Sequence, residues 1–297
     1  MSHTPSVPVT DDDLHDPAVH RWLDAEPTHV AAIDSHAHVF VRGLPLAAQR
    51  RHAPDYDATL DAYVTHLSAH GVSHAVLVQP SFLGTDNRFL LDVVRRYPQR
   101  FRGVVVVDPS IDAETLDAFA QCGVVGIRLN LLGLPLPDLR SARWQPLFAH
   151  VNALGWHVEV HREAADLPAV VGALLDAGCT VVVDHFGRPD PLPGERDPGF
   201  RYLLSVAATG RVWVKLSAAY RSADANEGAM LGARLAQPLL ERFTPARLVW
   251  GSDWPHTQHR HLVDYAATHA MLAQWVPDAE QRATILAASA SELFRFG

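Results

Sequence analysis

The chain has 297 residues, of which 48% are apolar and 20% are charged, and its formal net charge is −8. This length suits a single α/β barrel of about 250 residues with short extensions, and the apolar content argues against disorder. The acidic balance and the lack of a basic run argue against nucleic acid as a partner. No apolar stretch approaches the length of a membrane-spanning helix, so we expect no membrane partner either.

Short runs rich in valine and isoleucine recur along the chain, as expected of strands buried in a parallel sheet. The predicted strands are Val30–Asp34, His74–Gln79, Gly103–Val107, Val124–Leu129, His157–Val160, Thr180–Asp184, Arg211–Leu216 and Arg247–Gly251. Helical segments separate them. The first predicted helix is capped by Asp57 and ended by Gly71, and the others are Asp86–Tyr97, Ala113–Cys122, Ala142–Leu154, Leu167–Ala177, Phe200–Ala208, Gly228–Phe243, His261–Gln274 and Ala279–Phe294.

Strict alternation of eight strands with helices predicts a closed (β/α)8 TIM barrel over residues 29–297, preceded by an N-terminal arm over residues 1–28. A doubly wound open sheet is the alternative, but no G-x-G-x-x-G motif follows the first strand. Two cysteines, Cys122 and Cys179, are too few for a disulfide framework. With no signal peptide pattern at the start of the chain, we expect a cytoplasmic location.

The chain contains 18 histidines, and the barrel separates them, because active sites lie at the carboxyl ends of barrel strands. Most of the histidines lie in predicted helices, in the arm or at the opposite ends of strands, where solvated or structural roles are expected. Both cysteines also fall on the opposite face. The histidines that remain at or beyond strand ends are His36, His38, His161, His185 and His256.

The main candidate site combines these histidines with Asp253, which follows the last predicted strand. His36 and His38 are two positions apart, so they share a strand face and both point into the barrel mouth. A lone histidine at a strand end is usually a packing residue, but several converging with an aspartate indicate chemistry. His36, His38, His161 and Asp253 form a plausible ligand set for one divalent metal, zinc or manganese. Asp253 is the expected general base that takes a proton from water.

Several segments resemble the amidohydrolase superfamily, and within it the 2-pyrone-4,6-dicarboxylate lactonase-like group. They are residues 33–40, 78–81, 84–87, 106–109, 126–130, 183–190 and 250–256, which run in order from the first strand to the last. The resemblance implies hydrolysis of an unsaturated, carboxylate-bearing lactone in aromatic catabolism. It also implies that Asp253 activates water while His36, His38 and His185 surround the scissile carbonyl.

The resemblance further implies a set of substrate-binding residues: Ser81, Arg128, Arg188, Arg221 and His256. Arg128 also follows from the residues themselves, because a guanidinium near the mouth of the fourth strand can hold a carboxylate through two hydrogen bonds. The alternative for the arginines is a structural ion pair, and for Ser81 it is a turn cap. The pyrone hydrolases look metal-independent, whereas other members of the wider group use one zinc, so both possibilities stay open.

Two departures from the group bear on the substrate and the metal. His161 stands where the pyrone hydrolases have a tyrosine, which restores a ligand of the metal-dependent relatives. The loop after Arg128 is the apolar segment 131–136, where the relatives have another basic residue. This missing cation predicts a substrate with fewer charges or a more apolar ring substituent.

One inward-facing pair has no predicted role: His157 and Glu159 share the strand face of His161, and a buried glutamate needs a partner such as His157 or Lys215. Other functions also remain open. They are a metal-dependent decarboxylase of an unsaturated acid, a sugar-acid lactone isomerase, and a binding protein that has lost its chemistry. The last is disfavoured because the whole histidine and aspartate set is present.

Overall fold

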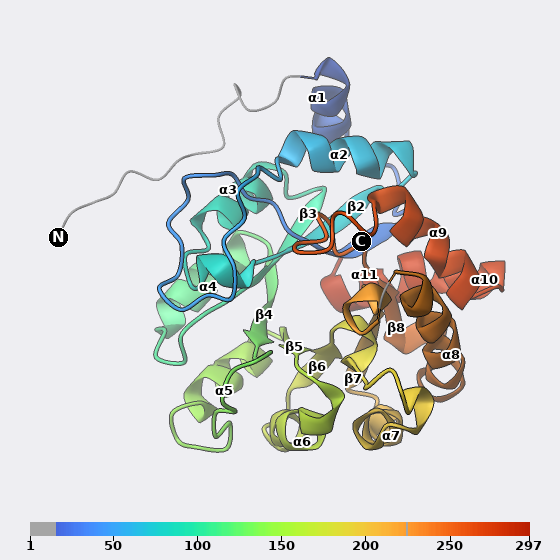
Figure 1. The fold of residues 1–297 in the computed structure, drawn as a ribbon. Helices are drawn as coiled ribbons and strands as arrows, with labels where there is room; N and C mark the ends of the chain where they lie inside the picture. Colours follow the sequence, from blue (N-terminus) through green and yellow to red (C-terminus); the bar gives the residue numbers. More distant parts are fainter. Residues whose placement is uncertain (1–15, 224) are drawn as a thin grey trace.

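The computed structural model describes residues 16–223 and 225–297. Its eight strands are β1 Ile33–Ala37, β2 His74–Val78, β3 Phe101–Val105, β4 Val124–Asn130, β5 His157–His161, β6 Thr180–Val183, β7 Val212–Leu216 and β8 Leu248–Trp250. They form one sheet in the order β1 to β8, and each strand pairs in parallel with the next. Figure 1 shows the strands at the centre with helices around them, so the predicted TIM barrel is confirmed.

The sheet closes between β1 and the segment that follows β8. Ala37 pairs in parallel with Trp254, and the amide of His38 donates to the Trp254 carbonyl over 2.8 Å. The amide of Asp253 likewise donates to the His36 carbonyl over 2.8 Å. These bonds place the residues after β8 directly against the predicted histidine pair.

The main helices lie close to their predicted positions, and segments such as α3 (Arg88–Arg96) and α7 (Pro198–Ser205) bury one apolar face, as helices packed on a sheet do. They are α1 Pro17–Asp24, α2 Leu60–Ala69, α3 Arg88–Arg96, α4 Ala113–Gln121, α5 Gln145–Ala153, α6 Leu167–Asp176, α7 Pro198–Ser205, α8 Ala225–Phe243, α9 Tyr265–Trp275, α10 Ala279–Ala283 and α11 Ser289–Phe294. A π-helical turn, Thr284–Ala288, joins α10 to α11, so the last predicted helix consists of three pieces.

Several predicted boundaries differ from the structure: β3 starts at Phe101 and not at Gly103, and α9 starts at Tyr265 and not at His261. Two further predictions are wrong for a reason that the contacts show. Asp57 does not cap α2: the Thr59 side chain accepts from the Ala62 amide, while Asp57 accepts from the Arg42 backbone and guanidinium. The first strand also starts three residues later than predicted, because the amides of Ala31 and Ala32 are bound by the Ser73 side chain and not by a neighbouring strand.

Side chains alternate along the strands between the barrel interior and the helix layer. The interior core contains at least one apolar side chain from every strand except β5, among them Ile33, Val76, Val182 and Trp213, and Phe294 packs with them. Above this layer, towards the carboxyl ends of the strands, the inward positions become polar. The barrel is therefore filled with apolar side chains below and with ionisable ones at its mouth.

The described part of the predicted arm contains α1, which buries Val19 and Leu23 and lies beside α2 (Figure 1). The Arg100 guanidinium donates to the Ala25 carbonyl over 2.7 Å and holds the end of this segment. The remainder of the arm, residues 1–15, lies outside the described residues. Within the described part, no helix is long and apolar enough to cross a membrane.

Candidate active site

A pocket of about 200 Å³ opens at the carboxyl ends of the strands. Residues from the loops after β1, β2, β4, β6, β7 and β8 line it together with the end of β5. Its predicted members are His38, Ser81, Arg128, His161, His185, Arg188, Arg221 and Asp253. The predicted site therefore assembles at one end of the barrel from segments far apart in the sequence.

Asp253 lies at the floor of this pocket with its two carboxylate oxygens in different surroundings. Oδ2 accepts a hydrogen bond of 2.6 Å from the Tyr220 hydroxyl and another of 2.6 Å from Nε of Arg221. Oδ1 instead lies 3.8 Å from Nε2 of His36 and 3.9 Å from Nε2 of both His38 and His185. One oxygen is thus held by two donors, while the other faces a space ringed by three imidazoles.

The three imidazoles are each oriented through Nδ1. His38 Nδ1 lies 2.7 Å from the Val78 carbonyl oxygen, which can only accept, so Nδ1 carries the proton and Nε2 has a free lone pair. His185 Nδ1 lies 2.8 Å from the Ser217 hydroxyl. His36 Nδ1 lies 3.0 Å from the Lys215 ammonium, which can only donate. Nδ1 also lies 3.4 Å from the Asp184 carboxylate, which can only accept, but the Lys215 contact is the shorter of the two. We therefore assign the His36 proton to Nε2, which lies 3.8 Å from Asp253 Oδ1; His36 itself does not line the pocket.

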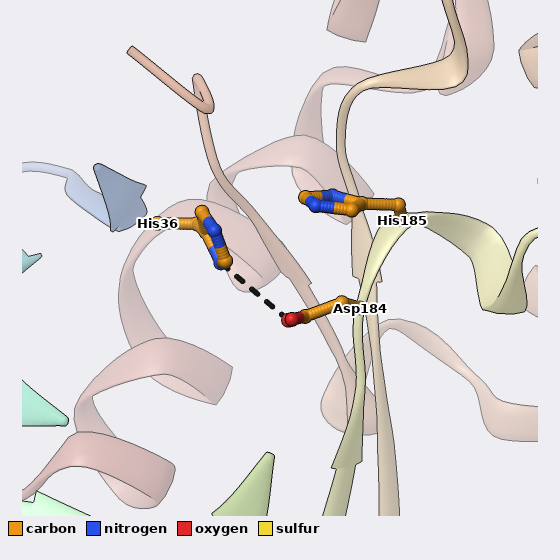
Figure 2. A group of neighbouring side chains, drawn as sticks. All are labelled: His36, Asp184 and His185. Carbon is orange, nitrogen blue, oxygen red and sulfur yellow. Dashed lines mark ion pairs between the residues drawn. The ribbon is translucent and has the colours of Figure 1, made fainter. Parts of the chain in front are cut away.

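A buried ion network lies beneath the histidines. Lys215 Nζ donates to Glu159 Oε1 over 2.5 Å and lies 3.4 Å from Asp184 Oδ1. Asp184 Oδ2 also binds Arg128, with 3.0 Å to Nε and 2.9 Å to Nη2. Asp184 Oδ1 lies 3.4 Å from His36 Nδ1, the contact drawn as a dashed line in Figure 2. The partner that Glu159 was expected to need is Lys215, and His157 lies 3.4 Å from the same oxygen.

These contacts set the ionisation of the site. Burial lowers the pKa of His38 to about 4 and that of His185 to about 3, and it holds the pKa of His36 well below its usual value. Burial raises the pKa of Asp253, but Arg221 and the surrounding histidines lower it more, so the pKa lies well below its usual value. At neutral pH the site therefore contains an anionic Asp253 and neutral imidazoles.

Backbone geometry brings these groups together. Gly251, just after β8, has no side chain because a Cβ there would lie 2.6 Å from the Cβ of His36. Asp253 and His185 both have a positive φ, 59° and 55°. Non-glycine residues adopt this left-handed conformation only at a cost, and such residues often cluster at functional sites.

The predicted substrate-binding residues do not all face the pocket. Ser81, Arg128, Arg188 and Arg221 line it. His256 does not: it is buried, and its ring makes an edge contact with the Tyr220 ring, with 6.1 Å between ring centroids. Arg128 lines the pocket and also forms the structural ion pair that was its alternative role, because its guanidinium is bound to Asp184.

Among the residues of the site, Tyr220 and Arg51 were not singled out in the sequence, and Lys215 was expected only as a partner of Glu159. Tyr220 holds Asp253, Lys215 orients His36, and Arg51 reaches the pocket from the long loop between β1 and α2. Arg51 Nη2 lies 3.4 Å from the Asn130 side-chain oxygen at the end of β4. A cation therefore does stand beside the end of β4, supplied by a different loop. The lack of a basic residue in the loop after Arg128 therefore does not by itself indicate a substrate with fewer charges.

The candidate metal ligands only partly fit a metal ion. Ligand atoms of His36, His38 and Asp253 lie within 4.8 Å of one another, but His161 is not a member of this group. Both ring nitrogens of His161 lack a hydrogen-bond partner, so nothing orients them as a ligand is usually oriented. His38 presents a free lone pair, but His36 has its proton on Nε2, where a metal would bind. The cluster is a candidate metal site that the Lys215–His36 contact opposes.

The amidohydrolase family model matches residues 33–296. This chain belongs to the amidohydrolase family. The 2-pyrone-4,6-dicarbaxylate hydrolase of Comamonas testosteroni is 31% identical over 277 residues, covering 86% of this chain and 88% of the relative. The 4-sulfomuconolactone hydrolase of Hydrogenophaga intermedia is 28% identical over 267 residues, covering 88% of each chain.

Solved structures place the chain in the same group. A candidate 2-pyrone-4,6-dicarboxylic acid hydrolase from Pseudomonas putida is 47% identical with a TM-score of 0.86, covering 90% of this chain and 98% of that one. Another candidate hydrolase of this name, from Acinetobacter baumannii and solved with citric acid bound, is 38% identical with a TM-score of 0.87, covering 90% and 100%. The resemblance to the pyrone dicarboxylate hydrolase group is therefore confirmed, and this amidohydrolase is an enzyme.

Proposed function

We propose that this amidohydrolase opens a small, unsaturated, carboxylate-bearing lactone with a water molecule that Asp253 activates. The observation that carries the proposal is the asymmetry of Asp253: Tyr220 and Arg221 hold Oδ2, while Oδ1 faces the three imidazoles. A carboxylate that is fixed through one oxygen and free at the other is placed to accept a proton from water.

The names of the relatives support this substrate class. Two curated relatives are hydrolases of a pyrone dicarboxylate and of a sulfomuconolactone, both of them anionic lactones. A similar structure contains bound citric acid, a small polycarboxylate. The pocket of this chain has four arginines, Arg51, Arg128, Arg188 and Arg221, which suit a substrate of the same charge.

In the proposed reaction, water attacks the lactone carbonyl carbon while Asp253 Oδ1 takes its proton. The Nε2–H of His36 points to the same space, so it can donate to the carbonyl oxygen as negative charge develops there. The bond between the carbonyl carbon and the ring oxygen then breaks. The ring oxygen takes the proton from Asp253 and leaves as an enol, so the product is an open-chain carboxylic acid.

The same site could hold a metal only through a different arrangement of protons. His36, His38 and Asp253 would hold zinc or manganese, which would polarise the carbonyl and lower the pKa of a bound water. That arrangement requires the His36 proton to leave Nε2, where the Lys215 contact keeps it. We therefore propose the metal-independent route. A small anionic substrate as the partner and a cytoplasmic location likewise remain proposals.

Asp253→Asn tests the proposed function on a panel of carboxylated pyrones and muconolactones. We expect kcat/KM to fall by about 10²–10⁴-fold, because the amide cannot take a proton. Asp57→Asn, which changes a surface carboxylate bound to Arg42, is the matched control. Ring opening is followed by ultraviolet absorbance and the product by mass. Release of carbon dioxide or an isomer of unchanged mass would identify the decarboxylase or isomerase, and an active Asp253→Asn would overturn the mechanism.

A further inference from the structure

Two of the four guanidinium groups that line the pocket are not bound to a carboxylate of the described residues. Arg221 is paired with Asp253, and Arg128 is paired with Asp184. In the described part of the chain, neither Arg51 nor Arg188 forms an ion pair with a carboxylate. Arg188 donates only to the Arg221 backbone carbonyl, over 3.0 Å, and its buried Nε has no hydrogen-bond partner.

These two guanidinium groups give the pocket a net positive charge. The histidines lining the pocket are neutral at neutral pH, so they add no charge. The charge of Glu163 acts on both Arg51 and Arg188, but its carboxylate is paired with Arg162 over 3.2 Å. Within the described chain, Arg51 and Arg188 therefore have no carboxylate bound to them, and a substrate with two negative charges would supply one for each. Guanidinium groups bind carboxylates through two parallel hydrogen bonds, which gives geometric as well as electrostatic selection.

The loop that holds Arg51 is anchored at both ends and in the middle. Phe40 and Ala58 exchange backbone hydrogen bonds of 2.9 and 2.8 Å, which close the loop over its whole length. The Ala47 amide donates to the Phe82 carbonyl over 2.8 Å and pins the loop to the turn after β2. The ring of His52, next to Arg51, lies 5.2 Å from the ring of Phe82.

The end of β4 completes the placement of Arg51. Asn130, which receives the Arg51 guanidinium over 3.4 Å, shares a strand face with Arg128 two positions earlier. The Arg51 side chain also passes beside Gly133, where a Cβ would lie 3.9 Å from Arg51 Cδ. Arg51 is exposed at the pocket wall, so a ligand can reach it without rearrangement of the barrel.

From this geometry we propose that Arg51 is a specificity-determining residue that binds a second carboxylate of the substrate. The inference rests on the proposed function and narrows it to dianionic lactones. Arg188 and Arg51 together supply the two positive charges that a dianion requires. A lactone with a single carboxylate lacks a group for Arg51 to bind.

Arg51→Met tests this proposal, with Arg50→Met as the matched control. Arg50 is the preceding residue, donates to the Ala47 carbonyl over 2.8 Å and does not line the active-site pocket. Calorimetry measures binding of benzene-1,3-dicarboxylate, which cannot be hydrolysed, and of benzoate. We expect Arg51→Met to weaken binding of the dicarboxylate by about 10- to 100-fold and of benzoate by less than about threefold. Arg50→Met should change neither by more than about twofold.

Kinetics with a pyrone dicarboxylate and a pyrone monocarboxylate should show the same difference in kcat/KM, with partial recovery in Arg51→Lys. Equal losses for both ligands, no loss in Arg51→Met, or wild-type binding of the dicarboxylate no tighter than of benzoate would overturn the proposal. If the wild type opens no lactone but Arg51→Met still selectively loses the dicarboxylate, the proposed function fails and the role of Arg51 stands. If lactones are opened equally well without Arg51, only the role of Arg51 fails.

Discussion

The two oxygens of Asp253 show how single contacts decide chemistry at the scale of one residue. Tyr220 and Arg221 both bind Oδ2, so the carboxylate cannot rotate without losing two short hydrogen bonds. His36 has its proton on the nitrogen that faces the other oxygen, because Lys215 donates to Nδ1. A base and a hydrogen-bond donor thus face the same space, each fixed by a residue that is itself buried.

Tyr220→Phe should reduce kcat/KM for a carboxylated lactone by about tenfold, since it removes one of the two donors that orient Asp253. Loss of a hydrogen bond to the charged form also raises the pKa of Asp253, so the acid limb of the pH–rate profile should move to higher pH. Tyr202→Phe, a half-buried tyrosine on α7 outside the pocket, is the control. A Tyr220→Phe profile that superimposes on the wild type would contradict this role.

Removal of metal tests whether the His36 proton is on Nε2. We expect activity to survive dialysis against a chelator, and the purified protein to contain much less than one zinc or manganese per chain, because the Nε2 proton of His36 opposes coordination. Elemental analysis and the rate before and after chelation provide the measurement. A stoichiometric metal whose removal abolishes activity and whose return restores it would contradict the expectation.

At the scale of elements, the charged side chains inside the barrel come from several strands and are paired with one another. Glu159 on β5 and Lys215 on β7 meet inside the barrel, and Asp184, directly after β6, links them to Arg128 on β4. Buried charges are tolerated only when they are paired, so each of these residues depends on elements that lie apart in the sequence. The same layer supports the imidazoles above it.

Lys215→Met should lower the free energy of unfolding by about 3–5 kcal/mol, because it leaves Glu159 buried without its cation. Lys215→Met combined with Glu159→Gln should recover part of this loss, since the unpaired charge is then absent. Urea unfolding followed by circular dichroism measures both. A double variant less stable than the single one would show that the pair does not act as described.

For the whole molecule, the mouth of the barrel is stable only while its histidines are neutral. Burial lowers the pKa of His38 and His256 to about 4 and that of His185 to about 3, against an ordinary value of 6.5 in the unfolded chain. Between those values the unfolded state binds more protons than the folded state. Stability is therefore complete above pH 6.5 and is lost as the pH falls towards 4.

The free energy of unfolding should decrease between pH 6.5 and 4 by about 1.4 kcal/mol per pH unit for each such histidine. Denaturant unfolding at several pH values checks this, and the single variants His38→Gln and His256→Gln should each show a shallower slope. A free energy of unfolding that stays constant from pH 7 to pH 5 would refute it. Over the same range above pH 5, kcat/KM should change little, because the site residues keep their charges.

The sequence by itself determined the barrel and the identity of its main polar residues. Apolar runs of strand length alternate with amphipathic helices, and the strict alternation permits few folds, so the eight strands could be placed. The barrel then assigns one face to the chemistry, which is why His36, His38, His185 and Asp253 could be selected before any contact was known. These inferences work because they depend on local periodicity and on one topological rule.

Only the tertiary structure decided which residues act together. Tyr220 and Arg51 come from a turn and a loop, and no local pattern marks them, because their partners are distant in the sequence. Lys215 could be named as a partner of Glu159, but its contact with His36 appears only in the folded barrel. The tertiary structure also shows that His256 packs against Tyr220 and does not line the pocket, and that His161 is not part of the His36, His38 and Asp253 cluster. Hydrogen-bond direction, side-chain tautomer and local charge balance arise from contacts across the closed barrel, so they exist only after folding.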